Sequence, residues 1–160
     1  MIEILDCTLR DGGYYTNWDF NKPLTSNYFK AMENLPVSYI EIGYRSLAHQ
    51  TYEGEYNFCP NYLLKEVRRL MPSKKIGIML NEKEVKPEDL NSLLSFEKGT
   101  VNLVRMAVDP QNLSRARNTA IKIKEMGFEV GFNVMYMSKW GEYPHFMTDV
   151  VSLDGIVDSF

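Results

Sequence analysis

The sequence predicts an α/β fold in which parallel strands alternate with helices. Short runs of apolar residues recur along the 160 residues, and they are almost continuously apolar, as strands are when helices cover their sheet. Between these runs lie segments whose apolar residues recur at helical spacing. The alternation predicts one domain over residues 1–160, which is long enough to bury a core.

The first expected strand covers residues 2–8 and ends in the segment Leu9-Arg10-Asp11-Gly12-Gly13. The two glycines predict a sharp turn there, because glycine adopts backbone conformations closed to other residues. Residues 14–23, which are polar and aromatic, are expected to form a loop. Arg10 and Asp11 would then lie at the carboxyl end of a strand, where α/β folds place their chemistry.

Five further strands and four helices complete the expected order. The first helix is expected from Thr25 or Ser26 to about residue 35. The second begins at Pro60, and the third begins at Pro87 and has Phe96 on its buried side. The fourth covers about residues 112–126, and Gly127 is placed to end it. A long polar loop is expected over residues 45–57, and long loops in compact domains are often functional. The remaining strands are expected over residues 37–44, 75–81, 100–109, 129–137 and 155–160.

This order of elements leaves two architectures. A complete barrel of eight β/α units needs about 250 residues, so a chain of 160 residues can be the N-terminal portion of such a TIM (β/α)8 barrel, with about six strands. An open doubly wound sheet is the alternative. An apolar strand at the C-terminus without a helix to cover it favours the barrel portion.

Composition excludes several classes of function. The net charge of −3 and the isoelectric point near 5.5 predict no general attraction to nucleic acid or to anionic membranes. No apolar run approaches the roughly 20 residues that span a bilayer. The chain enters a strand containing Glu3 and Asp6 at once, which is unlike a signal peptide. Cys7 and Cys59 have no framework spacing and are expected to be reduced thiols, so a cytoplasmic location is predicted.

Three motifs lie in register with the predicted strands. They are Leu5-Asp6-Cys7-Thr8-Leu9-Arg10-Asp11-Gly12, Ile40-Glu41-Ile42-Gly43 and Val157-Asp158-Ser159-Phe160. The first resembles the strand-one signature D-x-T-L-R-D-G of the DRE-TIM metallolyases, and most of all that of the 4-hydroxy-2-oxovalerate aldolase branch. The second resembles the I-E-x-G of the family's second strand, and the third resembles the V-D-S of its sixth.

The resemblance implies a fold and an activity. It implies a β/α barrel that cleaves a carbon–carbon bond in a 2-oxo acid, with Asp11 binding Mn²⁺ or Mg²⁺ and Arg10 stabilising the enolate. A hard cation that polarises a 2-oxo acid, together with a fixed guanidinium, suits that reaction. A small 2-oxo acid is then the expected partner, with homo-oligomerisation possible. Judged from the residues alone, Asp11 could instead cap a turn while Arg10 makes a surface ion pair.

Two charged residues interrupt apolar strands. An ionised carboxylate such as Glu41 is costly inside a strand unless it is paired. Glu41 could orient Arg10 or a metal-bound water, or it could pair with Arg105. Arg105, inside the fourth strand, could clamp a substrate carboxylate or be a structural partner.

Residues near two strand ends complete the set of candidates. Asn133 could line the site or be an amide satisfied at the end of its strand. Ser159 matches the family motif and is a candidate for binding substrate.

The chain departs from the family pattern at two places. The nearest branch has a catalytic histidine shortly after R-D-G, whereas this chain has Tyr14 and Tyr15, which could act in its place or pack over the site. The family completes its metal site with an H-x-H pair, which this chain lacks, and His49 and His145 are expected to be surface residues. Two alternatives therefore stay open: a Claisen condensation with an acyl-CoA, and a degenerate, non-catalytic domain.

Overall fold

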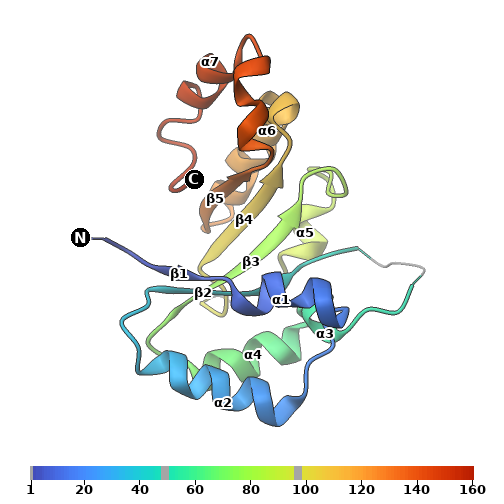
Figure 1. The fold of residues 1–160 in the computed structure, drawn as a ribbon, viewed down its shortest axis with the longest axis vertical. Helices are drawn as coiled ribbons and strands as arrows, with labels where there is room; N and C mark the ends of the chain where they lie inside the picture. The colour runs from blue at the N-terminus through green and yellow to red at the C-terminus, as the bar shows by residue number, and fades with distance from the viewer. Residues whose placement is uncertain (1, 48–50, 96–98) are drawn as a thin grey trace.

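The computed structural model describes residues 2–47, 51–95 and 99–160, so the predictions for His49 and Phe96 lie outside the described residues. The described chain forms one sheet in which every neighbouring pair of strands is parallel and the spatial order follows the sequence (Figure 1). Its five strands are β1 Leu5–Asp6, β2 Tyr39–Tyr44, β3 Lys75–Asn81, β4 Leu103–Val108 and β5 Glu129–Val134.

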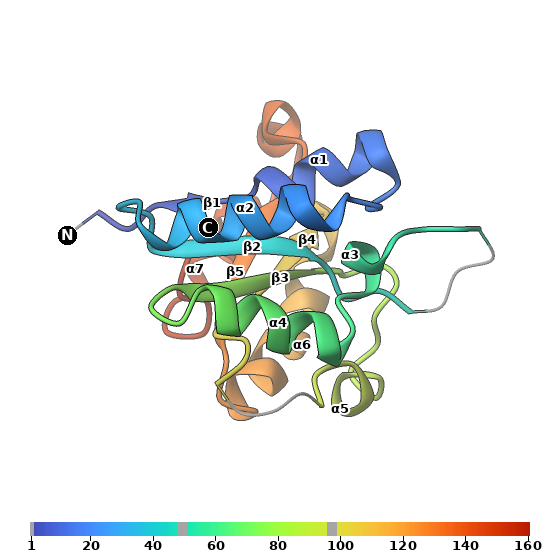
Figure 2. The ribbon, with the colours of Figure 1, turned by 90° about the horizontal axis from the view of Figure 1, so that it is seen from below.

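Helices follow each strand. The α-helices are α1 Thr8–Thr16, α2 Lys22–Glu33, α3 Glu55–Phe58, α4 Asn61–Leu70, α5 Leu90–Leu93, α6 Leu113–Glu125 and α7 Phe146–Val151, and the 3₁₀ helices are η1 Pro110–Asn112 and η2 Met137–Glu142. Figure 2 shows α2 and α4 running beside the curled sheet. The predicted stop of α6 is confirmed, because Gly127 adopts a left-handed φ of 92°.

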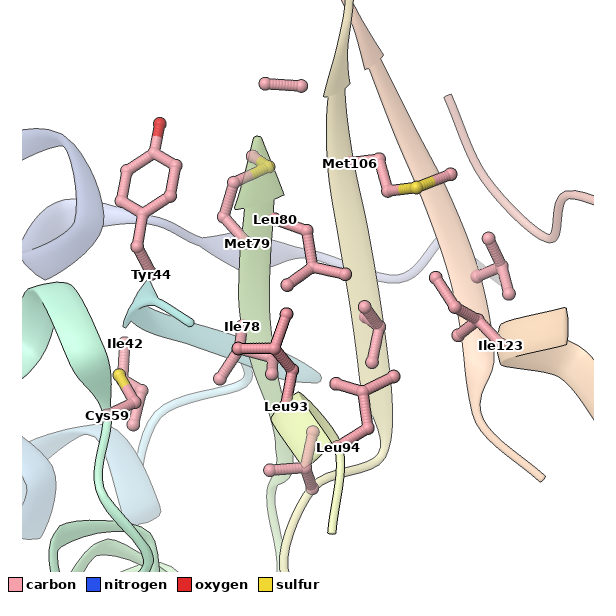
Figure 3. Packing of buried hydrophobic residues seen from close by; sticks show 14 of the residues in the cluster. Ile42, Tyr44, Cys59, Ile78, Met79, Leu80, Leu93, Leu94, Met106 and Ile123 are labelled. Carbon is pink, nitrogen blue, oxygen red and sulfur yellow. The ribbon is translucent and has the colours of Figure 1, made fainter. Parts of the chain in front are cut away.

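The two faces of the sheet differ in chemistry because successive strand residues point to opposite sides. One face carries fully buried apolar side chains that pack with those of α2, α4 and α6 to form the core (Figure 3). These strand residues include Ile40, Ile42, Ile76, Ile78, Leu80, Val104, Met106, Val130 and Phe132. The opposite face carries polar residues on nearly every strand: Tyr39, Glu41, Lys75, Arg105 and Glu129.

The prediction of a barrel portion with about six strands is wrong. The structure is a five-stranded parallel sheet that curls into a half-barrel, and residues 155–160 add only an isolated bridge between Ser159 and Gly131. The amide groups of Ile156 and Val157 both donate to the carbonyl of Leu153 at 3.0 Å, which holds this segment in a turn. The apolar pattern of these residues therefore does not produce a strand.

The predicted turn at Gly12-Gly13 is also wrong, because α1 runs straight through both glycines. The helix begins directly after a two-residue β1, where the Asp6 carboxylate accepts hydrogen bonds from the amide and the hydroxyl of Thr8, both at 3.0 Å. A β-carbon at Gly13 would lie 2.0 Å from Nε1 of the Trp18 indole. Gly13 is thus needed for close packing of Trp18 rather than for a turn.

None of the helices in the described ranges is long and apolar enough to cross a membrane.

Replacing Gly13 with alanine should destabilise the domain, because the new methyl group overlaps the rigid indole of Trp18. Overpacking of this kind costs about 1–3 kcal/mol, and urea unfolding would measure it. Gly12→Ala in the same helix is the matched control, since its β-carbon would make only ordinary contacts of 3.9 Å with Phe20. That control should be neutral or stabilising by up to about 1 kcal/mol. Equal effects of the two substitutions would contradict this role of Gly13.

Candidate functional site

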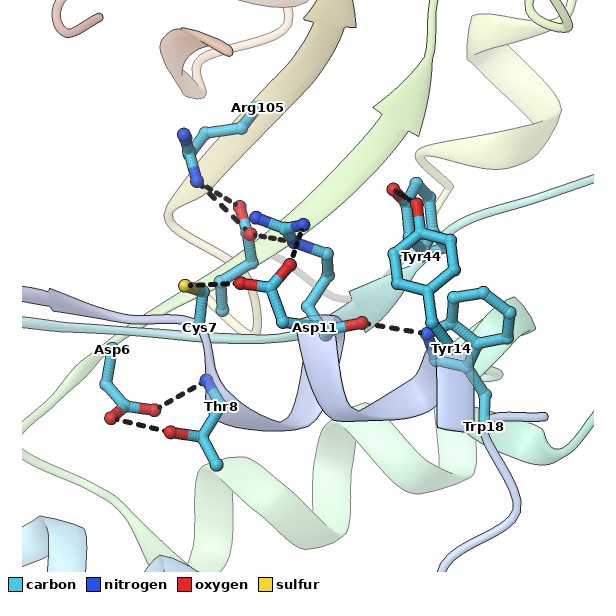
Figure 4. A network of polar contacts seen from close by, with 10 residues as sticks. Asp6, Cys7, Thr8, Asp11, Tyr14, Trp18, Tyr44 and Arg105 are labelled. Carbon is cyan, nitrogen blue, oxygen red and sulfur yellow. Dashed lines mark hydrogen bonds and ion pairs between the residues drawn. The ribbon is translucent and has the colours of Figure 1, made fainter. Parts of the chain in front are cut away.

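The centre of the candidate site is a buried carboxylate that pairs with two guanidinium groups. Glu41 is fully buried on β2, and its Oε1 accepts a hydrogen bond of 2.7 Å from Nε of Arg10 on α1. Nη1 of Arg105, on β4, donates to both carboxylate oxygens at 3.2 and 3.0 Å (Figure 4). The structure therefore brings together three of the predicted residues, and both partners expected for Glu41 contact it at once.

Arg10 is buried, with 8% of the residue exposed, and its contacts hold it in place. Its backbone carbonyl accepts a hydrogen bond of 3.1 Å from Nε1 of Trp18. Burial disfavours the charged guanidinium, but the hydrogen bond and the charge of Glu41 outweigh burial and raise the pKa of Arg10 above its ordinary value. Nη2 of Arg10 donates no hydrogen bond to a described residue, so this fixed cation keeps a donor for a bound anion.

Asp11 lies beside Arg10 and is half exposed, with 56% of its side chain accessible. Its Oδ1 accepts a hydrogen bond from Nη1 of Arg10, and its Oδ2 accepts one of 3.2 Å from the thiol of Cys7. Burial and the Asp11 carboxylate raise the pKa of the Cys7 thiol, which disfavours a reactive thiolate there. Cys7 and Cys59 are both free cysteines, as predicted.

These donors do not by themselves fit a divalent cation. Across residues 2–47, 51–95 and 99–160, no three His, Cys, Asp or Glu side chains are grouped so that they could hold a metal. A hard cation takes several oxygen ligands, and both oxygens of Asp11 already have partners. The described residues therefore do not form a metal site by themselves.

Arg105 also faces a cavity of about 460 Å³ on the polar side of the sheet, and Ser159 lines the same cavity. A β-carbon at Gly131 would lie 2.7 Å from Cγ of Arg105 and 2.8 Å from Oγ of Ser159. Glycine at this position thus lets the Arg105 side chain cross β5. Ser159 lies beside Arg105 on an isolated bridge to Gly131 and not on a strand, and its role in binding substrate stays a prediction.

A polar group that was not predicted from the sequence lies at the amino-terminal ends of β2, β3 and β5, and two of its members, Tyr39 and Glu129, line this cavity. Tyr39 donates a hydrogen bond of 2.6 Å to Glu129, and Nζ of Lys75 lies 2.6 Å from the Tyr39 hydroxyl and 2.8 Å from Glu129. These contacts with Glu129 and Tyr39 raise the pKa of Lys75 above its ordinary value. The three residues occupy the same face of their strands, a pattern that the alternation along each strand could have revealed.

Aromatic side chains border the site at the carboxyl end of β2. The hydroxyls of Tyr14 and Tyr44 lie 2.7 Å apart, and the rings of both meet the Trp18 indole edge to face at centroid distances of 4.7 and 5.6 Å. Burial and the Tyr14 hydroxyl raise the pKa of Tyr44 above its ordinary range. Tyr15, by contrast, is 93% exposed.

The other predicted residues lie outside this cluster. Asn133 is paired in register with Ala107 near the carboxyl end of β5, and the hydrogen bonds of Arg10 and Glu41 to described residues do not include it. His145 is exposed at the start of α7, as predicted for a surface histidine.

Comparison with known proteins finds a similar solved structure. No protein-family model and no curated protein matches the chain. A crystal structure described as "the N-terminal domain of a putative aldolase from Bacteroides vulgatus" is similar over 98% of this chain, with 53% sequence identity and a TM-score of 0.94. The match covers 52% of that chain, so the present chain spans about half its length. This similarity fits an aldolase-like family.

The buried position of Glu41 predicts a strong effect of neutralising it. Glu41→Gln leaves two guanidinium groups without their shared anion, and breaking a buried ion pair costs about 3–5 kcal/mol. Asp11→Asn is the control at the exposed end of the same network, where an ion pair is worth at most about 1 kcal/mol. Urea unfolding of both variants would measure the difference, and similar losses would contradict the central position of Glu41.

Proposed function

We propose that this chain carries the enolate-stabilising part of an aldolase site that cleaves a carbon–carbon bond in a 4-hydroxy-2-oxo acid. The observation that carries the proposal is the guanidinium of Arg10, which is buried, is fixed by Glu41, and keeps one nitrogen, Nη2, that no described residue accepts from. Preorganised donors of this kind stabilise charge that develops on an oxygen during reaction. The similarity to a domain described as belonging to an aldolase supports the same conclusion.

The proposed reaction is a retro-aldol cleavage. The C4 hydroxyl of the substrate loses its proton, the C3–C4 bond breaks, and its electron pair moves to the C2 carbonyl to form an enolate. An aldehyde leaves, and protonation at C3 gives a 2-oxo acid. Arg10 would donate to the enolate oxygen, while Arg105, whose Nε and Nη2 contact no described acceptor, would bind the substrate carboxylate.

We assign to Tyr14 the positioning of the C4 hydroxyl, whose proton is lost to solvent. Of the two tyrosines that replace the expected histidine, Tyr14 is the one whose hydroxyl lies in the aromatic border of the site. Its hydrogen bond to Tyr44 fixes the position of the phenol oxygen. Orientation of a reacting hydroxyl by such a group lowers the entropic part of the barrier.

Metal binding by Asp11 stays a prediction. Asp11 would supply one oxygen to Mn²⁺ or Mg²⁺, with the further ligands supplied from outside the described residues. Calorimetric titration with Mn²⁺ tests this point, and Asp11→Ala should abolish whatever binding is measured. A non-catalytic domain is the second candidate, and the lack of a metal-ligand group among the described residues favours it.

The activity is tested by measuring pyruvate release from 4-hydroxy-2-oxovalerate in the presence of Mn²⁺, using the full-length protein that carries this chain. Arg10→Lys should lower kcat by about 10²- to 10³-fold, the effect of removing a donor to a developing oxyanion. Arg117→Lys is the matched control. Arg117 lies on α6, donates a hydrogen bond to the Ser152 carbonyl at the end of α7, and has no place in the candidate site, so the change should leave kcat unchanged.

Two results would decide against the proposal. No release of pyruvate, or an unchanged kcat in Arg10→Lys, would remove the aldolase assignment. Release of free CoA from an acyl-CoA in the same assay would favour a Claisen condensation instead.

A further inference from the structure

The indole of Trp18 contacts three residues of the candidate site. Its Nε1 donates a hydrogen bond of 3.1 Å to the carbonyl of Arg10, and its ring meets the rings of Tyr14 and Tyr44 edge to face (Figure 4). Arg10 and Tyr14 are four positions apart in α1, so they lie on the same face of the helix. One buried side chain therefore links the proposed enolate donor to the phenol that positions the substrate hydroxyl.

The packing around Trp18 leaves its ring and its backbone little room to move. An added β-carbon at Gly13 would lie 2.0 Å from Nε1 of the indole, and one at Gly54 would lie 2.1 Å from the Trp18 carbonyl oxygen. The amide of Gly54 also donates to the Asn17 carbonyl at 2.7 Å. Trp18 is thus enclosed from two sides, by α1 and by the residue that precedes α3.

The backbone at Trp18 adopts a conformation that side chains other than glycine disfavour. Asn17 and Trp18 have left-handed φ angles of 51° and 53°, which are uncommon for bulky residues. Strained backbone persists where the surrounding structure holds it, and it is concentrated at functional sites. Here the amide of Trp18 donates to the Gly13 carbonyl at 3.0 Å, and the turn directs the indole back onto the carbonyl of Arg10.

We propose that Trp18 is a positioning residue, which holds Arg10 in place through the indole N–H and holds the Tyr14 ring by packing against it. The contact with Arg10 concerns the structure of the site alone. The effect on catalysis rests on the proposed aldolase function, because it requires that Arg10 donates to an enolate oxygen. Trp18 acts through its neighbours, so its replacement should slow the reaction without weakening the binding of the substrate carboxylate by Arg105.

The test is Trp18→Phe in the full-length protein, which removes the N–H donor and keeps an aromatic ring. Trp140→Phe is the matched control, because Nε1 of Trp140 also donates to a backbone carbonyl, that of Met135 at 3.0 Å, outside the candidate site. In the pyruvate assay, Trp18→Phe should lower kcat by about 5- to 100-fold, between the loss of one hydrogen bond and a misplacement of about 1 Å. KM should stay near the parent value, and Trp140→Phe should leave kcat and KM unchanged.

A nuclear magnetic resonance measurement tests the positioning of Arg10 independently of the reaction. In the ¹⁵N-labelled protein, the Nε–H of Arg10, which donates to Glu41, is the side-chain signal that Arg10→Lys removes. Trp18→Phe should shift this signal, and Trp140→Phe should not. Should Trp18→Phe fail to fold, 3-benzothienylalanine at position 18 keeps the shape of the indole without its N–H, and the same residue at position 140 is the control.

An Arg10 signal that Trp18→Phe leaves in place, or equal shifts in the two variants, would overturn the proposal. A signal that shifts in Trp18→Phe alone, in a protein that releases no pyruvate, would reject the aldolase function and leave the positioning of Arg10 standing. Pyruvate release with the same kcat in Trp18→Phe as in the parent would reject the role of Trp18 in catalysis and leave the aldolase function standing.

Discussion

The carboxylate of Glu41, buried between two guanidinium groups, is the interaction on which the rest of the site depends. A charge with no exposure to solvent persists only when it is paired and hydrogen-bonded, and Glu41 receives both from Arg10 and Arg105. These partners come from α1 and β4, so one carboxylate ties the first helix to the middle of the sheet. The pairing also fixes the guanidinium that we propose to face the enolate.

The division of the sheet into two faces explains why charge can be placed there at all. The apolar side chains on one face pack with the helices and form the core. The polar face is then free to carry Glu41, Arg105 and the group of Tyr39, Lys75 and Glu129. Gly131 contributes by the absence of a side chain, since any β-carbon there would collide with Arg105.

The sequence predicted the alternation of elements well, and β3 is confirmed over residues 75–81 as expected. It also predicted that Glu41 needs a buried cation, because the cost of an unpaired charge in a strand does not depend on the details of the fold. The misread glycines show the limit of such reasoning. Gly12 and Gly13 look like a turn, yet Gly13 is required by the Trp18 ring, a contact that only the folded chain reveals.

The prediction of a sixth strand is wrong because local hydrogen bonds compete with strand pairing. An apolar run at residues 155–160 is compatible with a strand, but hydrogen bonds to the Leu153 carbonyl hold it in a turn. The left-handed backbone at Asn17 and Trp18 was not predicted either, because such a φ angle is uncommon for tryptophan.

A double-mutant cycle between Glu41 and Arg105 tests the central claim most directly. The free energy of unfolding would be measured for the parent chain, Glu41→Gln, Arg105→Met and the double variant. If Glu41 is the shared anion, the sum of the two single losses should exceed the loss in the double variant by about 0.5–3 kcal/mol, the range for residues in direct contact. Additive losses would show that the two residues stabilise the fold independently and would contradict the account.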